Sequence, residues 1–216
     1  MISAAVIEAL KEIVPADKVL LQEPMKLHTT FRIGGPADCL VYLENEEQLC
    51  KIQKYLRLVD VPYTVIGNGS NLLVSDQGYA GIVLVVGKHM SRIEVKDCYL
   101  EAEAGALMSQ VAKAAKEHGL TGLEFAAGIP GTIGGGAVMN AGAYGGEMKD
   151  VLLNSEYVST DGTSGELDNE AMELSYRHSA YENSNLVITA ASVRLAPADR
   201  NEIKNSSAGP PTLKLV

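Results

Sequence analysis

Several residue types are scarce in this 216-residue chain, which has no tryptophan, two phenylalanines and three cysteines. Cys39, Cys50 and Cys98 are odd in number and form no C-x-x-C pair, which argues against a disulfide framework and against a zinc site. No cluster of His, Cys, Asp and Glu has metal-ligand spacing, so we predict no metal. Positive charge is also scarce, and the net charge of −9 argues against nucleic-acid and anionic-membrane binding.

Targeting signals are missing as well. The first residues, MISAAVIEALKEIVP, lack the basic stretch and apolar core of a signal peptide. Apolar residues make up 46% of the chain, enough for a folded core in one large or two small domains. We therefore expect a globular, cytoplasmic protein with reduced thiols.

Glycine, by contrast, is concentrated in one uncharged stretch, FAAGIPGTIGGGAVMNAGAYGG, from Phe125 to Gly146. A long run of bare backbone with unpaired N–H groups suits an extended anionic ligand such as a dinucleotide. A membrane-spanning helix with a G-x-x-x-G pair is disfavoured, because Pro130 and the many glycines make a poor helix. A purely structural glycine-rich turn between strands stays open as an alternative.

Hydrophobic periodicity predicts a mixture of helices and strands too irregular for a doubly wound sheet. Ser3 and Asn45 are candidate N-caps for the first two helices, and Gln48 is placed to complete a capping box. The expected fold class is therefore α+β, in two halves joined near Gly87. The expected helices are residues 4–14, 46–59 and 107–118, and the expected strands are 39–44, 63–66, 72–76, 79–86, 91–95, 99–105, 155–160, 163–167 (a hairpin with an Asp-Gly turn) and 186–195.

A second glycine-containing loop, Gly67-Asn68-Gly69-Ser70-Asn71, follows the β-branched strand at residues 63–66. Such a loop can form a phosphate-binding nest, and an ordinary Asn-Gly hairpin turn is an equal alternative. It is not a G-x-G-x-x-G fingerprint, because Leu72 occupies the last glycine position. The sequence has no Walker A motif.

Arg177 is the most informative charged residue, because it lies between Tyr176 and His178 just before a hydrophobic strand. Its planar guanidinium suits a carboxylate and can stabilise negative charge that develops during a reaction. An ordinary surface arginine is the alternative. The four histidines have no Ser or Cys partner at a usable spacing, and His118 suits the end of a helix.

Four segments, in order, resemble the family of UDP-N-acetylenolpyruvoylglucosamine reductases of the shorter type, in the p-cresol methylhydroxylase-like class of FAD proteins. They are HTTFRIGGPAD (28–38), VIGNGSNLLVSD (65–76), GLEFAAGIPGTIGGGAVMNAGAYGGEM (122–148) and SYRHSAY (175–181). One local departure is Val138, where the family often has an aromatic residue.

The resemblance implies an α+β, two-subdomain FAD-binding fold. Its subdomains are expected at residues 1–86 and 87–197, and residues 198–216 are expected to be the remnant of a linker to a substrate-binding domain. The FAD pyrophosphate is expected on the loop from Gly67 to Asn71, and the isoalloxazine against residues 128–135. The implied cofactor-binding residues are Ile66, Gly67, Asn68, Gly69, Ser70, Asn71, Leu72, Ala127, Gly128, Ile129, Pro130, Gly131, Gly134, Gly135, Asn140, Gly142, Tyr144 and Ile188.

The implied activity begins with reduction of FAD by NADPH. The reduced flavin then passes a hydride to the enolpyruvyl group of UDP-N-acetylglucosamine enolpyruvate, giving UDP-N-acetylmuramate for peptidoglycan synthesis. Arg177 matches the family's catalytic arginine. A non-catalytic FAD-binding module and another flavin oxidoreductase of the same class are the alternatives.

The last residues depart from the family pattern. The family continues into a third domain through a motif S-A-G-S-x-F-K, whose second serine is a proton donor, and that domain later supplies a catalytic glutamate. Here Ser207-Ala208-Gly209 is followed by Pro210. We therefore expect FAD binding to be retained, the second half-reaction to be impaired, and apolar surface normally covered by the third domain to promote self-association.

Overall fold

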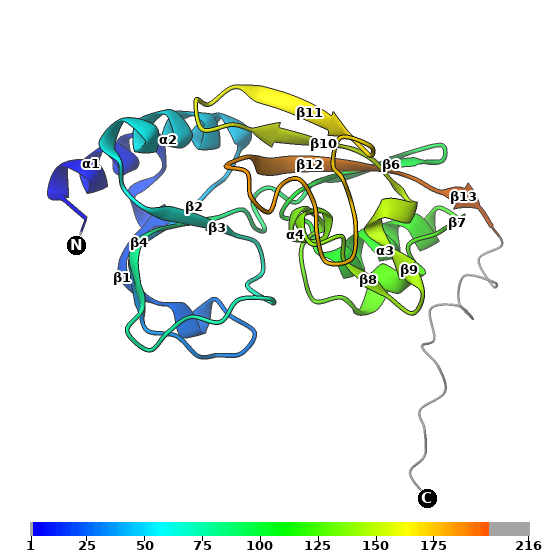
Figure 1. Ribbon diagram of the computed structural model, residues 1–216, viewed down its shortest axis with the longest axis horizontal. Helices are drawn as coiled ribbons and strands as arrows, with labels where there is room; N and C mark the ends of the chain where they lie inside the picture. Colours follow the sequence, from blue (N-terminus) through cyan, green and yellow to red (C-terminus); the bar gives the residue numbers. More distant parts are fainter. Residues whose placement is uncertain (1, 199–216) are drawn as a thin grey trace, which may run out of the picture.

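Two β-sheets lie next to each other in the computed structural model, which describes residues 2–198 (Figure 1). In the first sheet, β2, β4 and β3 are parallel to one another, and β1 runs antiparallel to β2 at the edge. Its strands, in order across the sheet, are β1 (Val19–Pro24), β2 (Pro36–Tyr42), β4 (Tyr79–Val85) and β3 (Tyr63–Ile66).

Helices α1 (Ala4–Ile13) and α2 (Glu46–Val59) begin where their capping residues predict. Ser3 Oγ accepts a hydrogen bond from Val6 N at 3.4 Å, and Asn45 Oδ1 accepts one from Gln48 N at 2.9 Å. These two predictions are confirmed. The capping-box detail is wrong, because the Gln48 side chain accepts from Glu44 N and not from Asn45 N. Both helices bury their apolar faces against one face of the first sheet.

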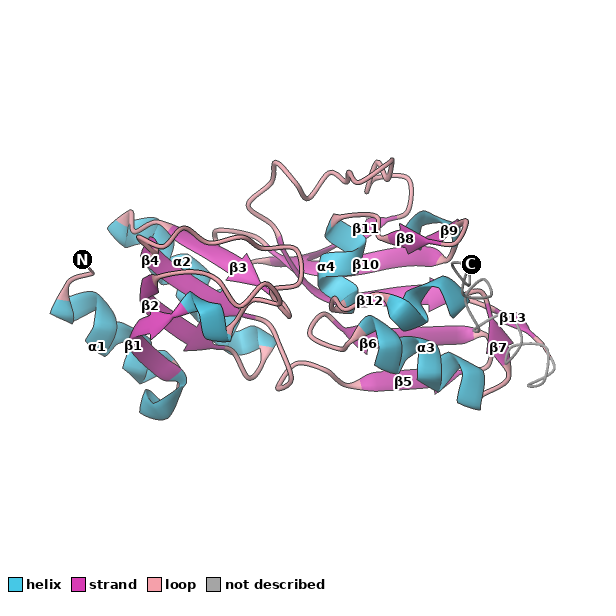
Figure 2. Cartoon of the chain, turned by 90° about the horizontal axis from the view of Figure 1, so that it is seen from below, coloured by secondary structure: helices cyan, strands magenta, loops and turns pink. Residues whose placement is uncertain are grey.

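The second sheet is antiparallel throughout, and α3 (Met108–Glu117) and the short helix α4 (Ile133–Val138) lie on one side of it (Figure 2). The predicted Asp161-Gly162 hairpin is confirmed between β10 and β11. In order across the sheet, its strands are β11 (Ser164–Asp168), β10 (Leu152–Val158), β12 (Val187–Arg194), β6 (Tyr99–Glu103) and β5 (Ile93–Lys96).

Two short ribbons complete the described strands. They pair β7 (Leu120–Thr121) with β13 (Ala196–Pro197), and β8 (Gly142–Ala143) with β9 (Gly146–Glu147). Four single turns of 3-10 helix connect the larger elements of the described chain; the one that precedes α4 is η3 (Glu124–Gly128).

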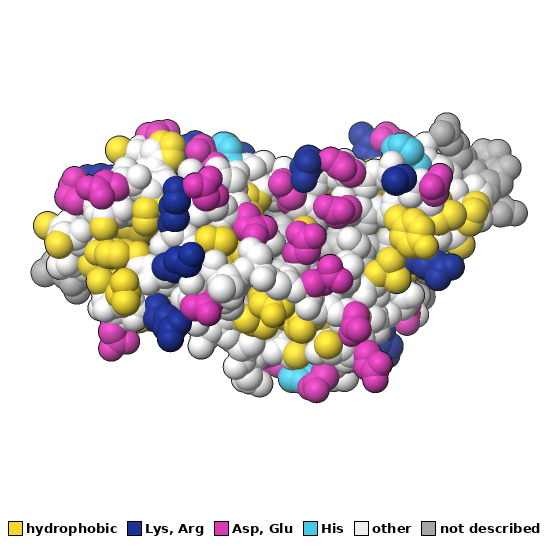
Figure 3. Space-filling view, turned by 90° about the horizontal axis from the view of Figure 1, so that it is seen from above, with side chains coloured by type: hydrophobic (Ala, Val, Ile, Leu, Met, Phe, Trp, Pro, Cys, Tyr) yellow, Lys and Arg dark blue, Asp and Glu magenta, His cyan; other side chains and the backbone are white. Residues whose placement is uncertain are grey.

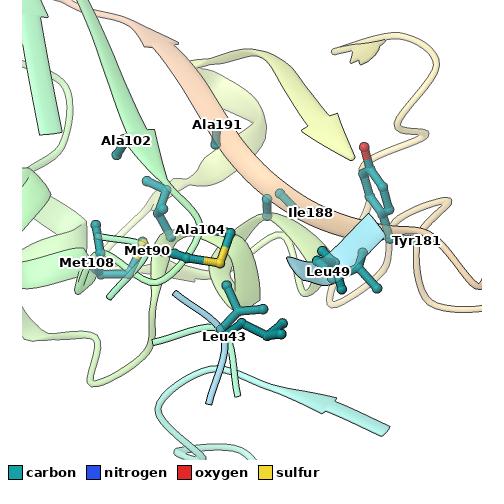
Figure 4. Close-up of a cluster of buried hydrophobic side chains, with 14 of the residues drawn as sticks. Leu43, Leu49, Met90, Ala102, Ala104, Met108, Tyr181, Ile188 and Ala191 are labelled. Atoms are coloured by element: carbon teal, nitrogen blue, oxygen red, sulfur yellow. The ribbon is translucent and has the colours of Figure 1, made fainter. Parts of the chain in front are cut away.

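One apolar core runs through both halves of the protein. Leu43 and Leu49, from the first half, lie in the same buried cluster as Ala102, Met108 and Ile188 from the second (Figure 4). The two halves are therefore packed together over apolar side chains. The boundary near residue 86 stays a prediction.

Several elements differ from the sequence-based expectation, among them the four strands of the short ribbons, which were not predicted. Residues 72–76 form no strand; Leu72 and Val74 instead pack against the second face of the first sheet. Strand β1 was not among the expected strands; Gln22, at φ +51°, and the terminal Pro24 are tolerated in it because it lies at the edge of the sheet. Helix α4 was not expected within the glycine run.

Candidate cofactor-binding site

The loop from Gly67 to Asn71 leaves the carboxyl end of β3, which is parallel to its neighbour β4. A hairpin turn joins antiparallel strands, so the Asn-Gly hairpin alternative for this loop is excluded. Across the described chain, no atom accepts a hydrogen bond from the backbone N–H groups of residues 68–71. Successive free N–H groups in a loop form an anion-binding concavity.

This loop touches the glycine run directly. The Asn68 side chain donates a hydrogen bond from Nδ2 to Pro130 O at 2.6 Å. Gly67 lies against Thr132 so closely that an added Cβ would overlap Thr132 Oγ1 and lie 3.0 Å from Cγ2. The two glycine-containing segments, far apart in sequence, are thus in contact, and only glycine fits at the contact point.

The first three backbone N–H groups of α4 donate hydrogen bonds to other atoms of the protein. Ile133 N donates to Ala106 O at 2.8 Å, and Gly134 N donates to Ala104 O at 3.0 Å. Gly135 N donates to the N-cap Thr132 Oγ1 at 3.3 Å. An added Cβ at Gly134 would lie 2.7 Å from Ala104 Cβ, so glycine there permits close packing. The glycine run therefore forms a packed wall, and the free backbone N–H donors belong to the loop after β3.

Two cavities of about 730 and 750 Å³ meet at this contact, since Ile66, Gly67 and Thr132 line both of them. Both volumes are within the usual range of roughly 300–1,000 Å³ for ligand sites. The first cavity lies between β3, α4 and the start of β12, and Gly134, Gly135 and Ile188 also line it.

The second cavity is bordered by five basic side chains, Lys18, His28, Arg32, Lys88 and His89, and by one carboxylate, that of Asp17. Sequence reasoning missed this group and also missed Thr132. A usable signal existed, because ligand sites in open α/β sheets gather outside the carboxyl ends of parallel strands. Residues 67–71 and 87–91 follow β3 and β4, which are parallel neighbours.

The structure divides the predicted cofactor-binding residues into groups. Ile66, Gly67, Gly134, Gly135 and Ile188 line the first cavity, and Asn68 lines the second. Asn140 and Gly142 line a smaller hollow with Arg177. The remaining predicted residues border none of these three spaces: Gly69, Ser70, Asn71, Leu72, Ala127, Gly128, Ile129, Pro130, Gly131 and Tyr144.

Arg177 lies on the turn after β11, exposed, beside this hollow of about 270 Å³. Its guanidinium Cζ is 5.9 Å from the centre of the Tyr176 ring, and its backbone φ is +54°. Within residues 2–198, no carboxylate pairs with this guanidinium at ion-pair distance. Its charge is therefore available to an anionic group in the hollow.

Glu147 supplies the nearest fixed negative charge to this hollow. A hydrogen bond from Lys149 lowers the pKa of Glu147, and Asn140 and the charge of Arg177 lower it further. The carboxylate consequently stays ionised at neutral pH. It accepts a hydrogen bond from Asn140 Nδ2 at 2.7 Å, so its orientation is also fixed.

Comparison with known proteins identifies similar sequences and structures. A family model described as "FAD binding domain" matches residues 37–168. A reductase of Agathobacter rectalis, UDP-N-acetylenolpyruvoylglucosamine reductase, is 44% identical over 92% of this chain and 67% of its own length. The crystal structure of that enzyme from Thermus caldophilus superimposes with a TM-score of 0.74 at 34% identity, covering 88% of this chain and 66% of that one.

More distant structures share the fold alone. A 4-ethylphenol oxidase from Gulosibacter chungangensis superimposes with a TM-score of 0.66 at 18% identity, covering 90% of this chain and 42% of its own. The chain spans 64–67% of the length of the curated reductases that it matches in Agathobacter rectalis and Clostridioides difficile. Over residues 2–198, no helix is long and apolar enough to cross a membrane.

Proposed function

Because this chain belongs to the UDP-N-acetylenolpyruvoylglucosamine reductase family, we propose that it supplies the FAD site and the catalytic arginine for reduction of UDP-N-acetylglucosamine enolpyruvate. Membership confirms the expected α+β, FAD-binding fold of the p-cresol methylhydroxylase type and FAD as the cofactor. The substrate, the product UDP-N-acetylmuramate and the hydride donor NADPH are parts of the proposal.

The free N–H groups of residues 68–71 are the observation that carries the cofactor assignment. FAD contains a pyrophosphate, whose oxygens need such donors. The first two residues of the loop, Gly67 and Asn68, line the cavities, Gly69, Ser70 and Asn71 follow outside their linings, and the Asn68–Pro130 hydrogen bond fixes the position of the loop. Gly67, Asn68 and the small residues of α4 would therefore hold such a cofactor, through free N–H donors and a surface without large side chains.

FAD bound at this site would supply the hydride chemistry, from NADPH to the carbon–carbon double bond of the enolpyruvyl group, with a proton taken up at the other carbon of that bond. The chain's own task is to orient the reacting groups and to stabilise charge. Hydride addition to an enoyl carboxylate places negative charge on the carboxylate side of the substrate. Arg177 is suited to hold that carboxylate through its planar fork of N–H donors and to stabilise this charge.

The partner proposals follow from the same chemistry. A UDP-sugar substrate places the reaction in the cytoplasm, where nucleotide sugars are made and used. Self-association also stays a proposal, and Leu27, Phe31 and Leu73 are exposed apolar side chains that could support it. Light scattering on the purified chain, with and without FAD, measures it directly.

The experiment has two stages on the purified chain. A flavin absorbance band after incubation with FAD and gel filtration tests the cofactor site. NADPH is then added in the absence of oxygen, and bleaching of the flavin absorbance is followed. UDP-N-acetylglucosamine enolpyruvate is added next, and the return of the flavin absorbance and the formation of UDP-N-acetylmuramate are measured.

The results of the two stages are interpreted separately. Failure to retain flavin overturns the cofactor assignment. Bleaching followed by product supports the whole proposal. Bleaching without product limits the chain to the first half-reaction, which is the outcome expected from Pro210 at the position of the family's proton-donor serine.

A further inference from the structure

Asn140 is buried at 2% exposure, and its side chain is fully occupied within the protein. Nδ2 donates to Ser175 O at 2.9 Å and to Glu147 at 2.7 Å, while Oδ1 accepts from Lys149 N at 2.9 Å. A side chain with two donor hydrogens and one acceptor in use offers little to a cofactor. Its sequence-based assignment to FAD binding therefore does not describe what the side chain does.

Its partner Ser175 begins the turn that carries Arg177. Ser175 and His178 exchange two backbone hydrogen bonds, each 3.1 Å long, which close the turn around Tyr176 and Arg177. Arg177 has a left-handed backbone there, at φ +54°, a conformation that a non-glycine residue keeps only when its surroundings enforce it.

A second hydrogen bond fixes the other end of the same turn. Ser179 is fully buried, and its Oγ donates to Val138 O at 2.7 Å. Val138 is the last residue of α4, and Asn140 lies two residues beyond it. The turn is thus held from both of its ends by one short piece of the glycine run.

We propose that Asn140 and Ser179 are positioning residues that hold the turn of residues 175–178 on the end of α4 and so fix where the Arg177 guanidinium lies. The hydrogen bonds above support the placement of Arg177. That this placement matters for catalysis rests on the proposed function. A cation that stabilises developing charge must be in place before the reaction, because reorientation during the step weakens its effect. The two hydrogen bonds provide that preorganisation.

The test compares Asn140→Ala, Ser179→Ala and a matched control, Asn169→Ala. Asn169 Nδ2 also donates to backbone carbonyls, those of Lys149 and Leu152, but it does not contact the turn. Amide hydrogen exchange of residues 175–178 is measured by mass spectrometry in the FAD-bound chain, together with the FAD dissociation constant.

The expected result is exchange at the turn about tenfold faster in Asn140→Ala and Ser179→Ala, since one net hydrogen bond corresponds to roughly a factor of ten in the local opening equilibrium. FAD affinity stays within about threefold of the wild type, because no hydrogen bond to the cofactor is lost. The control leaves exchange at the turn unchanged. Unchanged exchange in Asn140→Ala, or a loss of FAD affinity as large as the change in exchange, overturns the inference.

Turnover separates this inference from the proposed function. If the wild type forms product, Asn140→Ala lowers kcat more than it raises KM, and Asn140→Ala/Arg177→Ala is no slower than Arg177→Ala alone. If Asn140→Ala lowers kcat by the same factor in the Arg177→Ala background as in the wild type, the positioning role is overturned. If the wild type forms no product but the turn opens as expected, the proposed function fails while the placement of Arg177 by Asn140 stands.

Discussion

Gly67 is the point where both halves of the site meet, and the structure allows the effect of a single added methyl group to be worked out. In Gly67→Ala the new Cβ overlaps Thr132 Oγ1 and lies 3.0 Å from Cγ2 and 3.2 Å from Cβ of Thr132. Overpacking of this kind costs about 1–3 kcal/mol. We expect the free energy of unfolding to fall by that amount and FAD binding to weaken, because relief of the overlap moves the loop.

Thr132→Ala identifies the atoms responsible. Alone it removes the N-cap of α4, where Oγ1 accepts from Gly135 N, at a cost of about 1 kcal/mol. In Gly67→Ala/Thr132→Ala, Oγ1 and Cγ2 are gone and only the 3.2 Å approach to Cβ remains. The double variant should therefore be more stable than the sum of the single changes predicts, by at least about 1 kcal/mol.

Urea unfolding followed by circular dichroism measures these differences, and quenching of flavin fluorescence measures FAD affinity. Gly87→Ala is the control for unfolding, because its added Cβ meets only Val85 Cγ1 at an ordinary 3.5 Å. If the two changes at Gly67 and Thr132 are additive within about 0.5 kcal/mol, the steric reasoning is wrong.

Three further outcomes are expected. Arg177→Lys keeps the charge but loses the fork, so it should retain FAD while reoxidation of the flavin by the enolpyruvyl substrate slows by about 10²-fold; an unchanged rate rules out bidentate binding. Burial raises the pKa of Glu156, and neighbouring carboxylates such as Glu166 raise it further. The folded state then binds that proton more tightly than the unfolded chain, so stability falls as pH rises above the ordinary carboxyl range. Glu156→Gln should therefore stabilise the protein at pH 7, by about 0.2–1 kcal/mol, and not near pH 4; equal effects at both pH values contradict this. Ser155→Ala removes the partner of the buried Tyr181 hydroxyl, which lies 2.7 Å from Ser155 Oγ, and should cost about 1–3 kcal/mol by urea unfolding, less when Tyr181→Phe is added.

The parts of the fold that sequence predicted correctly are those set by local chemistry. Ser3 and Asn45 cap their helices with their own side chains, and the Asp161-Gly162 pair forms its hairpin within a few residues of the chain. Their signals lie within one helical turn or one hairpin. The same holds for β12, whose apolar run is long enough to be recognised by itself.

The parts that sequence missed depend on distant residues. Helix α4 has low intrinsic propensity, and its first N–H groups are satisfied by Ala104 and Ala106, which lie far back along the chain. The placement of Arg177 depends on Asn140, 35 residues before the turn that it holds. No local pattern encodes either contact, so the glycine run could be recognised as functional but not divided into its roles.

Although the protein is acidic overall, the two faces of the second sheet differ in charge, as the alternation of side chains along β6 shows. Along β6, Glu101 and Glu103 point to the outer face of the second sheet, while Ala102 and Ala104 point into the core. Acidic side chains gather across the middle of that outer face (Figure 3). Ala104, on the opposite side of the same strand, lines the first cavity. The net charge therefore gives no measure of the site itself, where the backbone N–H donors of residues 68–71 lie near the basic side chains that border the second cavity. Because Lys18, Arg32 and Lys88 border that cavity, we expect FAD affinity to fall as salt is raised; an affinity that does not change with salt would assign binding to the neutral N–H donors alone.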